Sequence, residues 1–135
     1  MPAPRQKAET PAAGCVFCAT PAEMLIVENP LALALFDIAP VTPLHTLVLP
    51  KRHVADYFDL TGEERAAIAA LLSECRQAIL ARDPTVEGFN IAVNVGRAAG
   101  QTIFHCHLHL VPRRPGDGAG IVLDGRKKRL LTSRA

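Results

Sequence analysis

Short apolar segments separated by turn residues predict a series of β-strands along the chain. Asn29-Pro30 is a turn signal between two of these segments. Pro50 and Pro112 each follow an apolar run, and proline stops regular pairing because it has no backbone donor. The strands expected from this pattern are 24–27, 31–36, 46–49, 89–94 and 102–111.

One long segment has the periodicity of a helix. Thr61 and Glu64 match a capping box, in which each side chain satisfies an unpaired backbone donor of the other residue. The helix is expected to end before Pro84, and its apolar face comprises Ile68, Leu71, Leu72, Cys75 and Ile79. Strands joined mostly by short loops around one long helix predict an α+β fold. We expect an antiparallel five-stranded sheet with one long helix and a short helix packed on it.

Length and composition limit the classes of protein and partner. The 135 residues fit one compact domain, and 49% of them are hydrophobic, which is enough to build a core. A net charge of +2 argues against a duplex-binding surface, so no stable nucleic-acid complex is expected. No apolar run approaches the ~20 residues that cross a bilayer, and residues 1–14 lack the apolar region of a secretory signal. These features predict a cytoplasmic protein without a membrane partner.

The same features divide the chain into three parts. Residues 1–14 are rich in proline, alanine and charge, and we expect them to form a flexible N-terminal tail. A single domain is expected at 15–116 because no internal repeat or domain boundary interrupts it. Residues 117–135 are expected to form a C-terminal tail that is glycine-rich and then basic at 126–129.

Three histidines stand at every second position of the predicted strand 102–111. Successive side chains of a strand point to opposite faces, so His105, His107 and His109 are expected to share one face. The opposite face is apolar and should be buried; it comprises Phe104, Cys106, Leu108 and Leu110. A rigid strand that presents three imidazoles suits a reactive surface, and a metal-binding ladder is the competing interpretation.

The residues around the histidines favour phosphate chemistry over a metal ladder. Gly100 allows a ligand to approach the backbone closely, and Gln101 and Thr102 offer neutral hydrogen-bond donors. Arg113 and Arg114 follow the strand and add positive charge. Neutral donors beside imidazoles are more typical of phosphate transfer than of a metal cage.

A C-x-x-C motif near the start of the chain adds a second candidate site. Cys15 and Cys18 form the motif, whereas Cys75 falls on the predicted helix and Cys106 lies among the histidines. In a reducing cytosol this spacing indicates metal binding or redox chemistry more often than a structural disulfide.

The histidine segment resembles the histidine triad (HIT) family. Its signature alternates three histidines with apolar residues, as in His-Cys-His-Leu-His within the stretch 100–111. The segments 36–40 and 45–53, together with Asn94, are also similar to that family. The resemblance extends over 15–114 and implies a HIT-like fold and a homodimer.

The resemblance also implies a two-step reaction on a nucleotide. His107 would attack the α-phosphorus to form a nucleotidyl-histidine, which water then hydrolyses. His109 would bind the phosphate, and His45 would orient the site. Asp37 would accept hydrogen bonds from the ribose. The full set of expected substrate-binding residues is Phe36, Asp37, Ile38, Asn94, Gly100, Gln101, Thr102 and His109, with no magnesium and no organic cofactor required.

The family pattern gives the C-x-x-C motif a role as well. Some HIT proteins carry a zinc ion, and mapping that pattern onto this chain gives Cys15, Cys18, His53 and His105 as its ligands. Four protein ligands leave no position for water, so the zinc would be structural. A redox motif is the alternative, but it usually begins a helix of a thioredoxin-like fold, which this chain does not resemble.

The expected substrate is a purine nucleotide derivative, either a dinucleoside polyphosphate or a nucleoside phosphoramidate. Gly-Gln-Thr before the histidines and the segment 112–117 after them look closest to the dinucleoside polyphosphate hydrolase branch of bacterial-type HIT proteins. The alternative is a nucleotide-binding or zinc-stabilised interaction module with little turnover.

Overall fold

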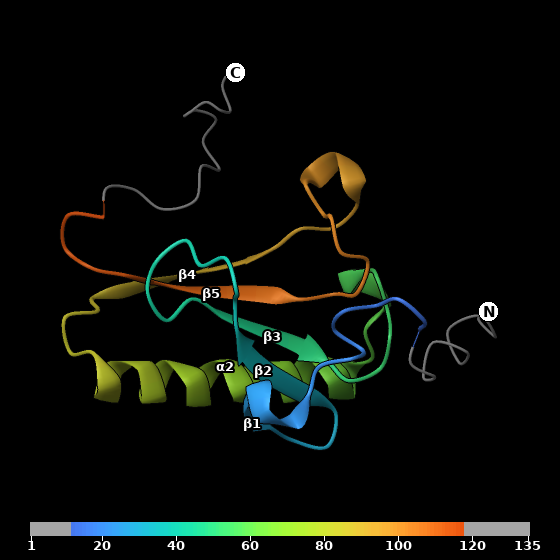
Figure 1. Ribbon diagram of the computed structural model, residues 1–135, viewed down its shortest axis with the longest axis horizontal. Coiled ribbons are helices and arrows are strands. Elements are labelled where there is room, and N and C mark those ends of the chain that lie inside the picture. The colour runs from blue at the N-terminus through green and yellow to red at the C-terminus, as the bar shows by residue number, and fades with distance from the viewer. Residues whose placement is uncertain (1–11, 118–135) are drawn as a thin grey trace.

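The computed structural model describes residues 12–117, which form one antiparallel sheet with a long helix on one face (Figure 1). The five strands lie in the order β1-β2-β3-β5-β4, and every neighbouring pair is antiparallel. Their bounds are Leu25–Glu28, Ala32–Phe36, Thr46–Pro50, Gly88–Val93 and Leu108–Arg113 for β1 to β5. The predicted fold class is confirmed. The predicted tails lie almost entirely outside the described residues.

Four of the five predicted strands agree with the observed bounds to within one residue at each end. The fifth prediction was wrong, because β5 begins at Leu108 and not at 102. Residues 102–107 form a loop instead, in which the Cys106 N–H donates to the Val54 carbonyl, 2.7 Å away, outside the sheet. The alternation of a strand therefore does not apply to His105 or Phe104.

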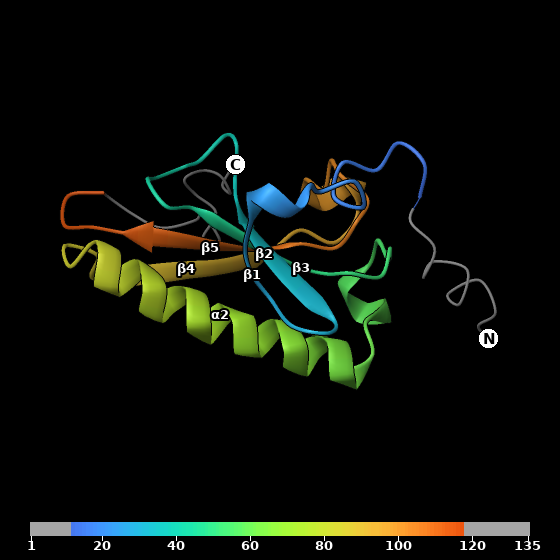
Figure 2. The same ribbon diagram turned by 60° about the horizontal axis from the view of Figure 1, so that its bottom comes forward.

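The long helix α2 spans Gly62–Arg82, and its predicted capping box is present. Thr61 Oγ1 accepts from the Glu64 N–H at 3.0 Å, and a Glu64 carboxylate oxygen accepts from the Thr61 N–H at 2.9 Å. Figure 2 shows α2 lying along one face of the sheet. Its buried side chains pack with residues of β2, β3 and β5; from α2 these are Ile68, Leu71, Cys75 and Ile79.

The Glu64 carboxylate also pairs with Arg52, which follows β3. The contacts from Arg52 Nε and Nη2 measure 2.8 and 2.9 Å, and both side chains are nearly buried. Burial raises the pKa of Glu64, but hydrogen bonds from Arg52 and from the Thr61 backbone outweigh burial and leave the pKa lowered. This pair fixes the segment that contains His53 against the start of α2.

The opposite face of the sheet carries loops instead of a helix. Phe17 packs there in a second apolar cluster with Leu35, Leu47 and Leu49. The predicted short helix corresponds, within 12–117, to three single 3-10 turns: η1 (Ala22–Met24), η2 (Tyr57–Asp59) and η3 (Arg97–Ala99). Figure 1 shows η3 standing clear of the sheet on the side away from α2. Among the described helices, none is long and apolar enough to cross a membrane.

Candidate active site and metal centre

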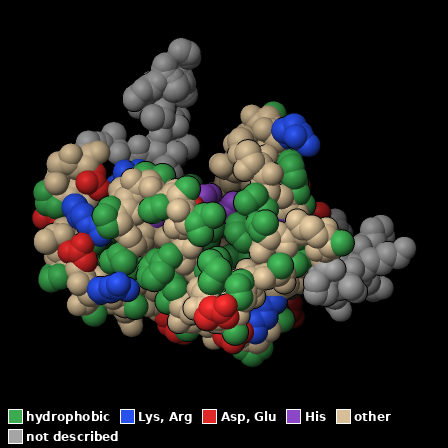
Figure 3. Space-filling view, in the orientation of Figure 1, with side chains coloured by type: hydrophobic (Ala, Val, Ile, Leu, Met, Phe, Trp, Pro, Cys, Tyr) green, Lys and Arg blue, Asp and Glu red, His purple; other side chains and the backbone are tan. Residues whose placement is uncertain are grey.

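A pocket of about 450 Å³ opens on the sheet face away from α2. Figure 3 shows histidine side chains at the bottom of a hollow between two raised parts of the surface. His107 and His109 line the pocket beside the loop that follows β2 and the loop that carries η3. All eight predicted substrate-binding residues lie in its wall: Phe36, Asp37, Ile38, Asn94, Gly100, Gln101, Thr102 and His109.

The ring of His107 is held by a backbone carbonyl and an aromatic neighbour. His107 Nδ1 lies 2.8 Å from the carbonyl oxygen of His105, an acceptor, so Nδ1 carries the proton. The neutral ring then has its lone pair on Nε2. The ring of Phe17 meets that of His107 at a centroid distance of 4.9 Å. The His105 carbonyl and the Phe17 ring therefore hold the His107 ring at the pocket wall in one orientation.

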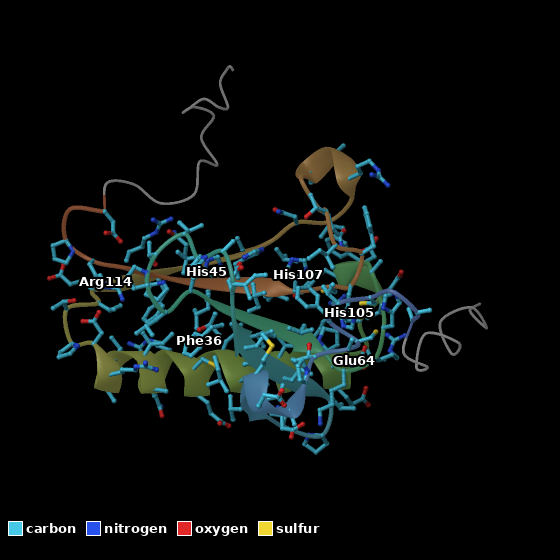
Figure 4. All side chains as sticks on the ribbon, viewed as in Figure 1. Phe36, His45, Glu64, His105, His107 and Arg114 are labelled. Atoms are coloured by element: carbon cyan, nitrogen blue, oxygen red, sulfur yellow. The ribbon has the colours of Figure 1, made fainter. Side chains whose placement is uncertain are left out.

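The backbone N–H of Val41 sets the tautomers of His45, which is labelled in Figure 4, and of His109. The Val41 N–H donates to His45 Nδ1 at 3.0 Å, so neutral His45 carries its proton on Nε2. That Nε2–H donates to His109 Nδ1 at 2.9 Å. His109 then carries its own proton on Nε2. The chain from Val41 through His45 makes His109 a hydrogen-bond donor at the pocket wall.

Burial disfavours the charged form of both of these imidazoles. Burial lowers the pKa of His45, although the Asp37 carboxylate opposes the change. Burial, helped by the neighbouring His107 and His45, lowers the pKa of His109 to about 4. His45 lies behind His109, where it is buried and does not line the pocket, and its supporting role stays a prediction.

The end of β2 and the loop after it form one rim of the pocket, with the side chains of Phe36, Asp37 and Ile38. Asp37 Oδ1 accepts from the Ala39 N–H at 2.9 Å, which closes a turn, while Oδ2 lies 3.6 Å from His45 Nε2. Ile38 lines the pocket and is 86% exposed. Phe36 is half-exposed at the rim, with the Arg82 guanidinium 5.8 Å from its ring centre.

The loop between β4 and β5 supplies the other wall. Gly100 has a φ of +95°, which side-chain-bearing residues rarely adopt. Gln101 is buried, and its amide is committed to backbone groups of its own loop and of the segment between β3 and α2. Its Nε2 donates to the carbonyls of Ala55 and Ile103, and its Oε1 accepts from the Gly96 N–H. The Gln101 side chain thus shapes the wall, and its predicted contact with phosphate stays a prediction.

The four predicted metal ligands converge beside the pocket. The ligand atoms of Cys15, Cys18, His53 and His105 all lie within 4.8 Å of one another. Cys15 Sγ and Cys18 Sγ are 3.5 and 3.6 Å from His105 Nδ1, and Cys18 Sγ is 3.3 Å from His53 Nδ1. Zn–S bonds of ~2.3 Å and Zn–N bonds of ~2.0 Å in a tetrahedron separate sulfur from nitrogen by roughly 3.5 Å. The cluster could therefore hold a metal ion.

The environment of His105 suits a neutral metal ligand. Its Nε2 donates to the Pro50 carbonyl at 2.8 Å, which leaves the lone pair on Nδ1 toward the two thiols. Burial lowers the pKa of His105 to about 4. A histidine ligand that donates its other nitrogen to a carbonyl is the usual arrangement in metal sites.

A second group with ligand atoms within 4.8 Å, formed by Asp37, His45 and His109, is less suited to a metal. A metal would bind His45 at Nε2, the nitrogen that carries the proton when Nδ1 accepts from Val41. The hydrogen-bonded chain therefore explains these residues better than coordination does.

Sequence reasoning missed three contributors to these sites. Phe17 stacks edge-on against both His105 and His107, and its place inside C-x-F-C was the only available signal. The N–H of Val41 and the carbonyl of Pro50 are backbone groups, so no side-chain pattern could have marked them.

Comparisons with known proteins agree with this geometry. A HIT domain is recognised over residues 20–116. An uncharacterized HIT-like protein of Mycobacterium tuberculosis is 45% identical over 107 residues, which cover 76% of this chain and 74% of that protein.

Two solved structures show the same fold. A zinc-bound histidine triad family protein from Mycobacterium smegmatis has a TM-score of 0.71 and 43% identity, covering 80% of this chain and 81% of its own. A HIT family protein from Bacillus anthracis has a TM-score of 0.74 and 39% identity, covering 87% and 86%. The chain described here belongs to the HIT family, whose members are generally nucleotide hydrolases and transferases.

Proposed function

We propose that this protein hydrolyses a purine nucleotide derivative at its α-phosphate, with His107 as the nucleophile. The observation that carries the proposal is the fixed tautomer of His107, whose Nδ1–H is held by the His105 carbonyl in a pocket wall. A neutral imidazole with a free lone pair attacks phosphorus without prior activation.

The first step forms a phosphorus–nitrogen bond and breaks the bond to the leaving group. His107 Nε2 attacks the α-phosphorus, and the leaving group departs with its electron pair; an amine leaving group takes up a proton from solvent as it departs. His109 Nε2–H donates a hydrogen bond to the phosphate, where negative charge accumulates in the transition state. Because His109 remains neutral at ordinary pH, this donor stays in place throughout the step.

The second step releases the nucleotide. Water attacks the same phosphorus, the bond to His107 Nε2 breaks, and its electron pair returns to the ring. The proton lost by water passes to solvent, and a nucleoside monophosphate leaves. Two displacements replace one difficult substitution, which is the general advantage of covalent catalysis.

The pocket offers different chemistry for each part of the nucleotide. Asp37 Oδ2 is an acceptor at the rim and suits the ribose hydroxyls. Ile38 and Leu35 give an apolar surface for the base. Asn94 and the loop at Gly100 lie across from them and suit the ribose and phosphate. Mostly apolar walls with few polar groups are typical of small-ligand sites.

We further propose that the ion of the Cys15, Cys18, His53 and His105 cluster is zinc and that it is structural. Support comes from the donor set, two thiols and two imidazoles at tetrahedral spacing. The Mycobacterium smegmatis relative is described as zinc-bound. Such an ion would connect the N-terminal segment to the loop that precedes β5.

The experiment that tests the function compares wild type with His107→Asn on diadenosine triphosphate and adenosine phosphoramidate. Turnover in the variant should fall to below about 1% of wild type, because removing a nucleophile eliminates the covalent path. Affinity for adenosine monophosphate and the melting temperature should change little. Mass spectrometry of wild type, quenched during turnover, should detect one added nucleotidyl group on His107.

A binding module with little turnover is the competing function. In that case wild type would bind adenosine monophosphate but would cleave neither substrate, and no nucleotidyl group would be found. Activity of His107→Asn above a few per cent of wild type would show that another group is the nucleophile.

A further inference from the structure

Two groups of the segment 50–53, which begins with the last residue of β3, meet the candidate metal cluster. The Pro50 carbonyl accepts from His105 Nε2 at 2.8 Å, which turns Nδ1 of that ring toward the thiols. His53 is one of the four candidate ligands, and its Nδ1 lies 3.3 Å from Cys18 Sγ. The position of this short segment therefore decides where one ligand lies and how another ligand is oriented.

The sheet holds only the first part of this segment. β3 ends at Pro50, and a further backbone hydrogen bond, from the Lys51 N–H to the Leu31 carbonyl, follows at 2.8 Å. Residues 51–56 form neither strand nor helix, and His53 lies among them. The position of His53 therefore depends on contacts made outside the sheet.

Arg52, the residue before His53, makes a two-point contact with the start of α2. Its Nε donates to Glu64 Oε2 at 2.8 Å and its Nη2 donates to Oε1 at 2.9 Å, so the planar guanidinium is held as a fork. Nη2 also donates to the Asp59 carbonyl at 3.2 Å. Only 12% of the Arg52 side chain and 5% of the Glu64 side chain are exposed, so water has little access to the pair. The fork therefore fixes the orientation of Arg52 and, through one peptide bond, restricts His53.

The Glu64 carboxylate is fixed on its other side by the capping box of α2. Its Oε1 accepts from the Thr61 N–H at 2.9 Å, while the Glu64 N–H donates to Thr61 Oγ1 at 3.0 Å. Figure 4 shows Glu64 and His105 toward the same end of the molecule. A continuous series of contacts thus runs from the start of α2 through Arg52 to the segment 50–53 and the cluster.

A buried pair of this kind affects orientation more than stability. Removing two charges from water costs free energy, and their attraction in the interior offsets much of that cost but adds little to it. Apolar groups can therefore often replace such a pair with little loss of stability, although the geometry imposed by the fork is lost. Contacts that orient the ligands of a metal are worth about 10- to 100-fold in metal affinity. The effect of the Arg52–Glu64 pair should therefore be visible in the metal affinity.

We propose that the Arg52–Glu64 pair is a positioning device for the metal centre, which holds the segment 50–53 in its metal-binding arrangement and so raises the affinity of the cluster for zinc. Neither residue belongs to the cluster itself. The inference rests on the proposed zinc site and adds two positioning residues to it. A ligand set that is already ordered loses less conformational entropy when the ion binds, and its affinity is higher for that reason.

The test measures the zinc dissociation constant of the full-length, metal-free chain by competition with a chromophoric chelator. In the double variant Arg52→Met with Glu64→Gln no charge is left buried alone, and the glutamine keeps an acceptor for the Thr61 N–H. The dissociation constant of this variant should rise by about 10- to 100-fold. Its cobalt(II) absorption spectrum at saturation should match that of wild type, because the same four residues bind the ion.

Thr61→Ala is the matched control, because it removes the capping hydroxyl and leaves the fork between Arg52 and Glu64 in place. Its melting temperature should fall, while its zinc dissociation constant should stay within about twofold of wild type. Arg52→Lys keeps the charge but loses the fork, so it should raise the constant by less than the double variant does. This single variant decides the question if the double variant does not fold.

Zinc binding as tight as that of wild type in the double variant, or in Arg52→Lys where the double variant does not fold, would overturn the inference. A weakened zinc affinity in Thr61→Ala would overturn it as well, since loosening of α2 alone would then explain the effect. A changed cobalt spectrum in the double variant would mean that different ligands bind the ion, which also contradicts a positioning role. Wild-type protein that binds no zinc would contradict the proposed metal site itself.

Discussion

Single backbone groups decide the chemistry of the histidines in this protein. The N–H of Val41 fixes the proton of His45, the carbonyl of His105 fixes that of His107, and the carbonyl of Pro50 fixes that of His105. The histidines were identifiable from their spacing, but the atoms that orient them belong to the backbone and carry no side-chain signal. Which residues take part was therefore predictable from the sequence, and which tautomer each adopts was not.

The low pKa of His109 leads to a prediction for its titration. Because burial lowers this pKa to about 4, the ring should remain neutral from pH 8 down to about pH 5. In the unfolded chain it would take up a proton near pH 6.5. Between those values only the unfolded state gains the proton, so stability should fall as the pH is lowered from 6.5 toward 4.

The measurement is an NMR titration of the His109 ring in the zinc-loaded protein. A midpoint near 6.5 would contradict the burial argument and would leave His109 partly charged at neutral pH. His45→Ala, which removes the ring packed against His109 at a centroid distance of 5.1 Å, should move the midpoint upward because it admits water.

Regular elements were predictable where local chemistry determines them. Helix α2 begins at its capping box, and its apolar spacing matches the face that packs on β2 and β3. The segment 102–107 has the alternation of a strand but lies outside the sheet. Contacts distant in sequence decide its path, namely the Val54 carbonyl and the cysteine cluster. Periodicity alone cannot reveal such contacts.

The candidate metal ligands Cys15, Cys18, His53 and His105 come from three segments that are distant in sequence, and loss of a bound ion should loosen these segments together. Cys18→Ser should reduce bound zinc from about one ion per chain to a small fraction, since thiolates are the stronger ligands. The melting temperature should fall by at least about 5 °C, because zinc binds the folded state preferentially. Elemental analysis and thermal unfolding, with and without chelator, measure both effects.

Cys75→Ala provides a matched control for the loss of a cysteine. Cys75 is buried against the core under α2, far from the cluster in the fold, so this variant should also be less stable. It should keep its full zinc content. Wild-type protein that contains no zinc after purification without chelators would contradict the structural role of the ion.

At the scale of the whole molecule, the sheet formed by residues 12–117 has an edge strand with no partner among those residues. β4 is the outermost strand beside β5, and Ile91 on it is 59% exposed. Open edges favour pairing with another chain, and two-fold dimers are the commonest soluble assembly. We propose that two copies of this protein pair along β4 to form a homodimer.

Light scattering at micromolar concentration should give twice the mass of the 14.5 kDa chain. Ile91→Asp should shift the mass toward that of one chain, because it places a charge in the apolar centre of the contact. Phe58→Asp, which alters an exposed apolar side chain on η2, should leave the mass unchanged. A wild-type mass of one chain at every concentration would exclude the dimer.

His105 has a consequence for how variants of this protein are interpreted. Its ring belongs to the cysteine cluster, while its own carbonyl oxygen holds the proton of His107. His105 thus contributes to both centres through two different groups. Its imidazole depends on the identity of the residue, whereas its backbone carbonyl would be present with any amino acid at this position. A substitution at position 105 removes the imidazole but retains the carbonyl. Any loss of activity would then show how far a bound ion, through the His105 side chain, fixes the position of that carbonyl beside His107. Supply of the ion in the cell would then set the fraction of molecules able to react.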